Sequence, residues 1–305
     1  MRTVEKTPKK LMMLVNPAAG RAITDPLLGS AVGAFCEAGY CPTVYYTTAP
    51  GTAAELAETY SPDYERLVVL GGDGTLSDVI AGLMNLSEAA RPRVGYIPMG
   101  TANDVANTLG LPMRQPQKAV EKILTGTPLE YDVGEMLGVG FFTYIAAFGA
   151  FTEVSYKTDQ ELKRTLGHLA YVIAGITSLG SIKAYPARVE YDGGSVEGRF
   201  IYGAVSNAVS VGGMVKMDPS LVDLSDGKME ILLVREPKSA ADLNSIVTGI
   251  LSQNYSNSPC LTILQSQRVR FTFEEPVPWT RDGEDGGAHG QLELRCHPRG
   301  VQIFC

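Results

Sequence analysis

The sequence lacks the cysteine and histidine patterns of a disulfide framework or a zinc site. Its five cysteines, Cys36, Cys41, Cys260, Cys296 and Cys305, are odd in number and contain no CxxC pair, so neither a disulfide-stabilised fold nor a zinc ribbon is indicated. The three histidines, His168, His289 and His297, are scattered along the chain, which favours packing or surface roles over metal binding. We expect a reduced protein of the cytoplasm.

Long hydrophobic runs and an excess of basic charge are also missing. No stretch reaches eighteen apolar residues, and the first apolar run holds five residues before Asn16 and Pro17, too few for a membrane span or a signal peptide. The formal net charge is -7 and the pI is near 5.1. A chain with this charge presents no broad basic face, so we do not expect nucleic acid as a partner.

Short apolar runs alternate with helical patterns over the first 130 or so residues. Apolar runs at 11–17, 43–48, 66–70 and 93–100 are separated by helical patterns near 25–38, 51–60 and 76–87. This alternation is typical of a parallel sheet covered by helices. Continuous apolar runs such as Leu67 to Leu70 fit strands that are buried on both faces. The sequence therefore predicts an α/β domain over residues 1–135.

Beyond about residue 135 the pattern changes to closely spaced β-like runs. The turn signal Asp192-Gly193-Gly194 lies between two alternating runs and predicts a hairpin, and helical patterns interrupt the runs near 159–180 and 239–251. We therefore expect a second domain, rich in β-structure and sandwich-like or barrel-like, over residues 136–299. The last strand, near 300–305, is expected to return to the first domain.

The glycine cluster Gly71-Gly72-Asp73-Gly74-Thr75 joins an apolar run to a helical pattern. Glycines permit positive φ and remove side chains, so backbone N–H groups at the start of the following helix can face an anion such as phosphate. The carboxylate of Asp73 would repel phosphate oxygens unless a cation such as Mg²⁺ lies between them. A turn that uses Gly and Asp only for its geometry is the alternative interpretation.

Three more loops follow predicted strands in the same way. They cover residues 16–21, 47–53 and 98–104, and the carboxyl ends of parallel strands are where α/β sheets bind ligands. Neither GxxxxGK[ST] nor GxGxxG is present, which argues against a P-loop NTPase and an ordinary dehydrogenase. Together the four loops favour a phosphate-binding edge of a different type.

The motifs "NPAAG", "VVLGGDGTLSDV", "IPMGTANDVANTLGLP", "LGHLAYVIAGITSL", "SNAVSVGGMVKMDPSLVDLSDGKMEILLV" and "RDGE" together resemble the diacylglycerol kinase catalytic domain family. The resemblance is to the soluble bacterial branch of the NAD kinase and lipid kinase superfamily, and it covers most of the chain. Only the GGDGT element is shared with NAD kinases. The resemblance implies an α/β nucleotide-binding domain followed by a β-rich, lipid-binding domain.

The resemblance also implies a set of ATP contacts in the four loops. Gly100 and Asn103 are expected to shape the last of these loops, and the implied contacts are Asn16, Pro17, Ala18, Ala19, Gly20, Thr47, Gly71, Gly72, Asp73, Gly74, Thr75, Leu76, Ser77, Gly100, Thr101 and Asn103.

Two carboxylates are implied as catalytic. Phosphoryl transfer to an alcohol needs a cation to neutralise developing charge and a base near the attacking hydroxyl. The resemblance places Asp73 on the side of the Mg²⁺ ion and Glu284, in "RDGE", in the position of the proton acceptor. From the residues alone, Asp282-Gly283-Glu284 reads more simply as a polar turn.

A second carboxylate pair, Asp223 and Asp226, stands at three-residue spacing around a predicted turn. Such oxygens suit Mg²⁺ or Ca²⁺ when a backbone carbonyl joins them, although an ordinary turn is again the simpler interpretation. The resemblance implies a structural Mg²⁺ held by Asp223, Asp226 and the carbonyl of Lys228.

The predicted helix at 159–180 carries apolar residues at helical spacing with basic residues nearby. It either rests on an anionic membrane surface or packs on the second domain as an ordinary amphipathic helix. We expect an ATP- and Mg²⁺-dependent lipid kinase that acts on diacylglycerol or a related lipid in a cleft between two domains. It would contact the membrane peripherally, and an exposed sheet edge could support a homodimer. A NAD kinase-like enzyme and a non-catalytic nucleotide-binding module at the membrane are the alternatives.

Overall fold

The computed structural model describes residues 9–19, 25–149, 183–211, 215–216 and 222–305. The chain forms two compact units, which are Met1–Tyr131 with Gly300–Cys305 (unit 1) and Asp132–Arg299 (unit 2). The predicted helix at 159–180 lies outside the described residues. Within the described ranges, every helix is too short or too polar to span a bilayer.

Unit 1 is built on a sheet of four parallel strands. In spatial order these are β4 (Arg93–Pro98), β3 (Arg66–Gly71), β1 (Lys9–Val15) and β2 (Tyr40–Tyr46). The last residues of the chain return to this sheet, because Ile303 of β15 (Glu284–Phe304) pairs in parallel with Val94 of β4. Continuous apolar runs in β1 and β3 are buried on both faces of the sheet, as parallel strands covered by helices require.

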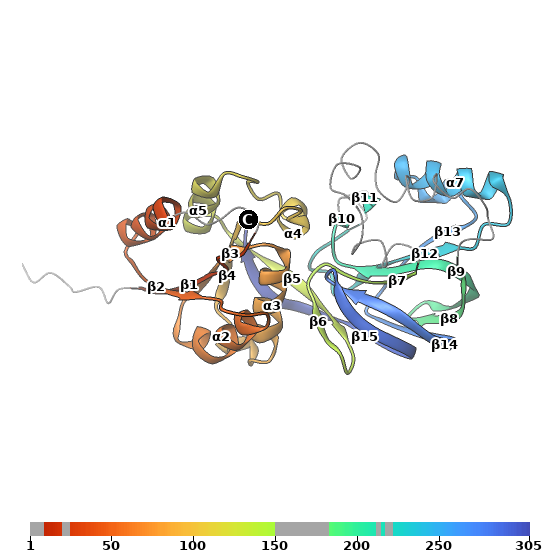
Figure 1. Ribbon diagram of the computed structural model, residues 1–305, viewed down its shortest axis with the longest axis horizontal. Coiled ribbons are helices and arrows are strands. Elements are labelled where there is room, and N and C mark those ends of the chain that lie inside the picture. The colour runs from red at the N-terminus through yellow and green to blue at the C-terminus, as the bar shows by residue number, and fades with distance from the viewer. Residues whose placement is uncertain (1–8, 20–24, 150–182, 212–214, 217–221) are drawn as a thin grey trace, which may run out of the picture. The chain divides into compact units, whose positions relative to one another are not determined.

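Helices cover both faces of this sheet, and each connects two strands (Figure 1). One face carries α1 (Asp25–Glu37) and α5 (Pro116–Thr125), and the other carries α2 (Thr52–Tyr60) and α3 (Asp73–Met84). A short helix, α4 (Asp104–Thr108), follows β4. The core beneath α1 and α5 gathers side chains from five strands and both helices, among them Leu11, Val68, Ile97, Phe35 and Ile123.

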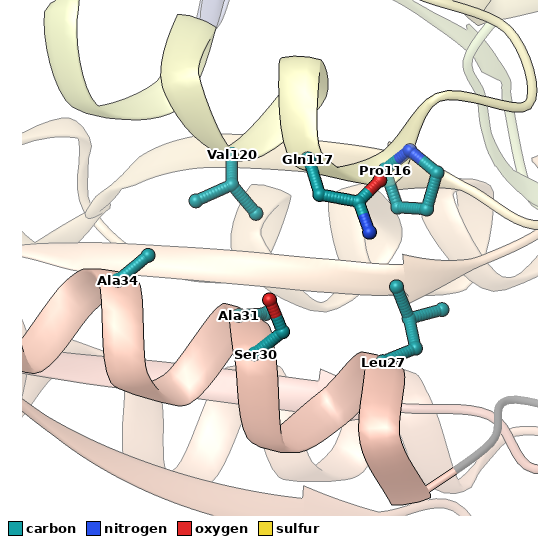
Figure 2. A pocket seen from close by; sticks show the side chains of 7 residues that line it. All are labelled: Leu27, Ser30, Ala31, Ala34, Pro116, Gln117 and Val120. Atoms are coloured by element: carbon teal, nitrogen blue, oxygen red, sulfur yellow. The ribbon is translucent and has the colours of Figure 1, made fainter.

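The contact between α1 and α5 leaves a shallow groove on the outside of unit 1 (Figure 2). Leu27, Ala31 and Ala34 of α1 face Pro116 and Val120 of α5 across a volume of about 70 Å³. Ligand sites for molecules of nucleotide size are typically several hundred Å³. This groove is therefore a gap between two packed helices and not a candidate for the nucleotide site.

Unit 2 is rich in antiparallel strands. Four of them close a ring by pairing in the order β7 (Ile145–Gly149), β9 (Gly194–Ser206), β8 (Tyr185–Tyr191), β14 (Arg268–Arg281) and back to β7. Outside the ring, β12 (Met229–Arg235) pairs with β9, β13 (Leu261–Ser266) pairs with β12, and β15 pairs with β14. The expected β-rich second region is present, and the structure adds the order in which its strands pair, which the sequence did not predict.

Register shifts let two long paired strands, β14 of the ring and β15 beside it, bend. The pairing of β14 with β15 shifts between Thr272 and Val277 and again between Pro278 and Thr280, where prolines interrupt the donor row of the strand. An aromatic cluster fills the interior, with ring centroids of Phe148 and Phe271 at 4.9 and 5.0 Å from that of Trp279. Trp279 is 1% exposed, so this cluster is the centre of the unit 2 core.

The smaller elements of unit 2 follow local sequence signals. A hairpin joins β5 (Pro128–Met136) to β6 (Gly140–Phe142), and a two-stranded ribbon pairs β10 (Ser210–Val211) with β11 (Val215–Lys216). The predicted helix near 239–251 is α7 (Ala240–Leu251). Its N-cap Ser239 accepts a hydrogen bond from the backbone N–H of Asp242 at 3.1 Å, which fixes the first turn. Short 3₁₀ turns occur at Ser61–Asp63, Glu88–Ala90 and Tyr255–Asn257.

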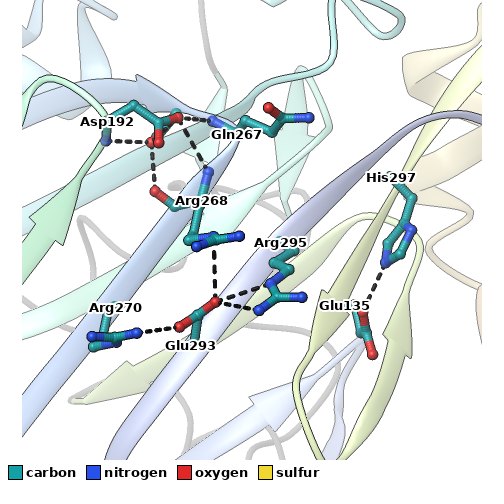
Figure 3. Close-up of polar contacts among 9 residues, drawn as sticks. Glu135, Asp192, Gln267, Arg268, Arg270, Glu293, Arg295 and His297 are labelled. Atoms are coloured by element: carbon teal, nitrogen blue, oxygen red, sulfur yellow. Dashed lines mark hydrogen bonds and ion pairs between the residues drawn. The ribbon is translucent and has the colours of Figure 1, made fainter.

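The predicted hairpin at Asp192 is formed, since β8 ends at Tyr191 and β9 begins at Gly194. The Asp192 carboxylate accepts hydrogen bonds from the backbone N–H groups of Gln267 and Arg268 and from the Ser266 hydroxyl (Figure 3). Burial raises the pKa of Asp192, but these hydrogen bonds outweigh it and the net pKa is lowered. The carboxylate is thus an anchor between the hairpin and the start of β14.

A cross-strand ion network lies on the exposed face of β14 and β15. The Glu293 carboxylate contacts the guanidinium groups of Arg270 at 2.6 Å, Arg295 at 2.8 Å and Arg268 at 3.4 Å (Figure 3). The hydrogen bond from Arg270 is the main cause that lowers the pKa of Glu293. Opposite charges on facing strands stabilise the pairing of β14 with β15, so the role of this network is to stabilise the fold.

Candidate active site

Loops from neighbouring strands meet at the carboxyl edge of the unit 1 sheet. The N–H of Asn16, directly after β1, donates to the carbonyl of Leu70 in β3 at 3.0 Å, and the N–H of Met99, directly after β4, donates to the carbonyl of Gly71 at 2.7 Å. The loops predicted to bind the nucleotide therefore begin at one edge of one sheet, where ligands bind in open α/β folds.

Two of these loops approach so closely that only glycine fits. A Cβ atom on Gly100 would lie 2.7 Å from the Cα of Gly72, and one on Gly72 would lie 3.3 Å from the Cα of Gly100. A Cβ on Gly71 would collide with the side chain of Thr75 at 2.6 Å. The glycines thus allow the backbones of two loops to pack against each other, which leaves a surface made mainly of main-chain groups.

Helix α3 begins inside the glycine cluster, three residues earlier than predicted. Its N-cap is Gly72, and the N–H of Leu76 donates to the carbonyl of Gly72 at 3.1 Å. The N–H groups of the first turn, at residues 73–75, precede that first helical hydrogen bond. A helix of twelve residues concentrates positive partial charge at this end, which favours a bound phosphate.

The carboxylate of Asp73 joins the start of α3 to the start of α4. Its two oxygens accept hydrogen bonds from the backbone N–H groups of Asp104 at 2.9 Å and Val105 at 3.2 Å. Asp73 therefore caps α4, a positioning role that the sequence did not predict. The side chain is half-buried, and a carboxylate is a ligand type that suits a Mg²⁺ ion that keeps most of its water ligands.

Asn103 shapes the loop after β4. It has a left-handed backbone (φ 54°) and is 3% exposed. Its side-chain oxygen accepts from the N–H of Gly100 at 2.9 Å and from the Tyr96 hydroxyl at 3.3 Å, and its amide donates to the carbonyl of Gly100 at 2.7 Å. Asn is one of the few residues that tolerate this backbone conformation. Its side chain closes the loop that brings Gly100 against Gly72.

Asn16 and Thr75 connect the first loop to α3. The Asn16 amide donates to the Thr75 hydroxyl at 2.8 Å, and the Asn16 side-chain oxygen accepts from the N–H of Ala18 at 3.0 Å. Thr75 is 6% exposed. Both side chains thus hold the loops in place, and any phosphate contact would come from the surrounding main chain.

The remaining predicted contacts differ in what they can offer. Pro17, Ala18, Gly74 and Thr101 are exposed, while Thr47 and Ser77 are half-buried. The N–H of Thr47 donates to the carbonyl of Val15 at 2.9 Å, which places Thr47 at the same edge of the sheet. Ala19 is 9% exposed, and Gly20 lies outside the described residues.

Leu76 is the predicted contact that the structure places in the core. Its side chain is fully buried and its N–H is used within α3. It therefore presents neither a side chain nor an N–H group to a ligand.

In unit 2, the "RDGE" motif forms the tip of the hairpin between β14 and β15. Arg281 pairs with Glu284, and the two residues between them, Asp282 and Gly283, have φ angles of 47° and 86°. This is a two-residue turn of the type that Asp-Gly sequences favour. The motif thus forms a turn, as the simpler interpretation of the sequence has it. The Glu284 side chain is exposed and is the group of this turn that is accessible to a substrate.

The predicted ion site at Asp223 and Asp226 is a pair of local turns. The Asp223 carboxylate accepts from the N–H of Ser225 at 3.0 Å, and the Asp226 carboxylate accepts from the N–H of Lys228 at 2.8 Å. Over the residues that the structure describes, no group of three or more His, Cys, Asp and Glu side chains is arranged to hold a metal. Two carboxylates and one carbonyl would not form such a group, so the Mg²⁺ site is still a prediction.

Buried acids lie beside this loop, and the sequence did not single them out. Asp132 accepts from the N–H groups of Gly227 and Arg299, both at 2.6 Å. Burial is the main cause that raises the pKa of Asp132, and burial also raises the pKa of Glu230 to about 7, with further contributions from Asp226 and Asp132. A nearby cation would lower the cost of holding several carboxylates together.

Residues that sequence reasoning missed are mostly partners in hydrogen bonds. Asp104 and Val105 hold Asp73, and Tyr96 supports Asn103. An acid at the first position of a helix, as Asp104 is in α4, was the one available signal. The backbone N–H groups that hold Asp73 carry no signal, because every residue type except proline supplies them.

The sequence matches two family models in chain order. Residues 10–136 match the diacylglycerol kinase catalytic domain, and residues 145–305 match the YegS C-terminal NAD kinase beta sandwich-like domain. The chain also has 98% coverage with two solved structures from Bacillus anthracis str. Sterne. One has a TM-score of 0.83 at 24% identity, and the other, described as a diacylglycerol kinase, has a TM-score of 0.74 at 21% identity. These two structures establish a shared fold.

Curated relatives extend this likeness over nearly the whole sequence. The diacylglycerol kinase of Bacillus subtilis (strain 168) is 32% identical over 280 residues, which are 92% of this chain and 91% of the relative. The diacylglycerol kinase of Staphylococcus carnosus (strain TM300) is also 32% identical, over 92% of this chain and 90% of the relative. The chain is therefore a kinase that belongs to the diacylglycerol kinase catalytic domain family.

Proposed function

We propose that this kinase transfers the γ-phosphoryl group of ATP to the free hydroxyl group of diacylglycerol or a closely related membrane lipid. The observation that carries the proposal is the main-chain surface at the start of α3, where Gly72 and Gly100 lie in contact beside the first-turn N–H groups. Such a surface fits phosphate oxygens. The names of the curated relatives support a lipid acceptor.

The unit 1 loops would hold the nucleotide without a basic P-loop motif. Phosphate oxygens would accept hydrogen bonds from the N–H groups at residues 73–75, while the Asp73 carboxylate holds the start of α3 against the start of α4. When bound, ATP would supply the phosphoryl group, and Mg²⁺ would neutralise the charge that develops on it. Asp73, at the start of α3, is the residue that would face the ion directly or through water.

Glu284 of unit 2 would act as the base. In the transfer, the lipid hydroxyl oxygen forms a bond to the γ-phosphorus, the bond from that phosphorus to its bridging oxygen breaks, and the hydroxyl proton passes to the Glu284 carboxylate. A positioned base of this kind contributes typically 10²- to 10⁴-fold in rate. Glu284 is exposed at a hairpin tip, which suits a group that must meet a substrate.

A structural ion and a membrane contact complete the proposal. Asp223, Asp226 and the carbonyl of Lys228 would hold Mg²⁺ beside the buried Asp132 and Glu230. This ion would stabilise the fold and take no part in the chemical step. The protein would reach its lipid from the cytoplasm as a peripheral membrane protein. Flotation with anionic vesicles tests that contact.

The direct test is phosphorylation of diacylglycerol in mixed micelles with labelled ATP and Mg²⁺, followed by identification of the labelled product. We expect Glu284→Gln to lower kcat by about 10³-fold while the melting temperature stays within a few degrees. The matched control is Asp285→Asn, which changes the neighbouring acid, whose carboxylate accepts from the N–H of Gly287 at 2.9 Å. Equal activity of Glu284→Gln and wild type would remove the base from the proposal.

The same assay separates the alternatives. Labelled product that requires NAD and not lipid would indicate a soluble nucleotide kinase. ATP binding without transfer to diacylglycerol, monoacylglycerol, sphingoid bases or phosphatidylglycerol would indicate that the chemistry has been lost. Either outcome would contradict the proposed lipid kinase activity.

A further inference from the structure

The turn that carries Glu284 needs no carboxylate for its own geometry. Asp282 and Gly283 both have positive φ, and Asn-Gly or Gly-Gly would form the same two-residue turn. Turn residues at hairpin tips are usually exposed, whereas Asp282 is 8% exposed. The buried side chain of Asp282 therefore has a role beyond the turn.

Asp282 anchors the hairpin tip to a different segment of unit 2. Its carboxylate accepts hydrogen bonds from three consecutive backbone N–H groups, those of Thr143 at 2.6 Å, Tyr144 at 3.0 Å and Ile145 at 3.0 Å. The Asp282 N–H in turn donates to the carbonyl of Ile145 at 2.8 Å. Successive N–H groups that converge on a carboxylate form strong, directional contacts. Four hydrogen bonds thus fix the backbone two residues before Glu284.

A second Asp-Gly hairpin in unit 2 provides an internal comparison. Asp192 also accepts three hydrogen bonds from a distant segment, from the Ser266 hydroxyl and from the N–H groups of Gln267 and Arg268. The residue two positions after Asp192 is Gly194, which has no side chain. The anchor at Asp192 can therefore contribute only to stability, whereas the anchor at Asp282 also fixes the residue that we assign as base.

We infer that Asp282 is a positioning residue, whose buried carboxylate holds the hairpin tip so that the Glu284 carboxylate meets the acceptor hydroxyl. This inference rests on the proposed function, because it requires Glu284 to be the base. Catalytic groups are sensitive to placement, and a shift of about 1 Å can cost about 10²-fold in rate. Loss of the anchor should therefore slow the chemical step more than it weakens either substrate.

The test compares Asp282→Asn with Asp192→Ala. Asn tolerates the left-handed backbone at 282, but its amide nitrogen cannot accept an N–H. Thr143 donates to one oxygen of Asp282 and Tyr144 and Ile145 to the other, so Asp282→Asn loses at least one of the three contacts. All three donors to Asp192 contact a single oxygen, so Ala is needed there to break the contact. We expect Asp282→Asn to lower kcat by about 10- to 100-fold, with the KM values for ATP and lipid within about two-fold of wild type. Amide exchange at residues 143–145 should accelerate. Asp192→Ala should lower the melting temperature similarly and leave kcat within about two-fold.

Equal kcat values for the two variants at equal folded fraction would overturn the inference. Should Asp282→Asn fail to fold, Thr143→Pro removes the shortest of the three hydrogen bonds and leaves the carboxylate in place. Its kcat is then compared with that of Asp192→Ala in the same way. Failure of the proposed function looks different, because wild type would then have no lipid kinase activity or Glu284→Gln would retain it.

Discussion

Two Asp-Gly pairs, one in each unit, show how the same dipeptide serves different ends. Asp73-Gly74 opens a helix, and Asp282-Gly283 closes a hairpin. In both, the carboxylate accepts backbone N–H groups from a segment distant in sequence, two for Asp73 and three for Asp282. Asp73 is half-buried and can still face a ligand, whereas Asp282 is buried. The difference in exposure separates an acid that can both position and bind from one that only positions.

Among the substitutions that test this comparison, removal of the Asp73 carboxylate should lower activity the most. Asp73→Ala removes both the proposed face for the metal and the cap on α4, so kcat should fall by about 10³-fold or more and stability by about 1–2 kcal/mol. Steady-state kinetics and urea unfolding measure the two effects. An Asp73→Ala enzyme with lower stability but normal kcat would reduce Asp73 to a cap.

A methyl group at Gly100 should have the next largest effect. The Cβ atom of Gly100→Ala would lie 2.7 Å from the Cα of Gly72, so the two loops must separate and the main-chain surface for phosphate changes. We expect the KM for ATP to rise by about 10- to 100-fold, equivalent to about 1–3 kcal/mol of binding. The control is Gly33→Ala in α1, where a Cβ atom meets nothing within 4 Å. Normal ATP affinity in Gly100→Ala would show that nucleotide binds elsewhere.

The smallest effect concerns stability and pH in unit 2. Because burial raises the pKa of Glu230 to about 7, the folded state holds a proton that the unfolded state releases near pH 4.5. The contribution of Glu230 to the free energy of unfolding is therefore complete below about pH 4.5, and it is lost as the pH rises through 7. Glu230→Gln, a neutral substitute, should remove this loss and gain on the order of 3 kcal/mol relative to wild type at pH 8.

Urea unfolding of wild type and Glu230→Gln at pH 5 and pH 8, with EDTA present, measures the difference. The two proteins should differ little at pH 5 and most at pH 8. A gap that does not grow between pH 5 and pH 8 would show that Glu230 is ionised at little cost in the folded state.

The sequence predicted α1, α2 and the strands β1, β3 and β4 of unit 1, because β1 and β3 are continuous apolar runs. It placed the start of β2 three residues late, since β2 is partly exposed and mixed in composition, and it did not predict α4 or α5. It also located the hairpin at Asp192 and the helix at 239–251, where Gly and Ser give local signals. The start of α3 was placed three residues late, since glycines are poor helix formers and the pattern of apolar residues begins only at Leu76.

The sequence could not predict what the motif acids contact. Asp282 and Thr143 are 139 positions apart, and Asp73 and Asp104 are 31 apart. The donors in both cases are backbone N–H groups, which every residue except proline supplies. Only the folded chain shows that each carboxylate holds a second loop in place. Removal of either carboxylate is therefore expected to displace that loop as well as to impair the reaction.

The most direct test of the account is a crystal structure of the protein with a non-hydrolysable ATP analogue and Mg²⁺. We predict phosphate oxygens within hydrogen-bond distance of the backbone N–H groups at residues 73–75, beside Gly100. Triphosphate density at any other place on the protein, with the 71–75 loop free of ligand, would contradict the central claim.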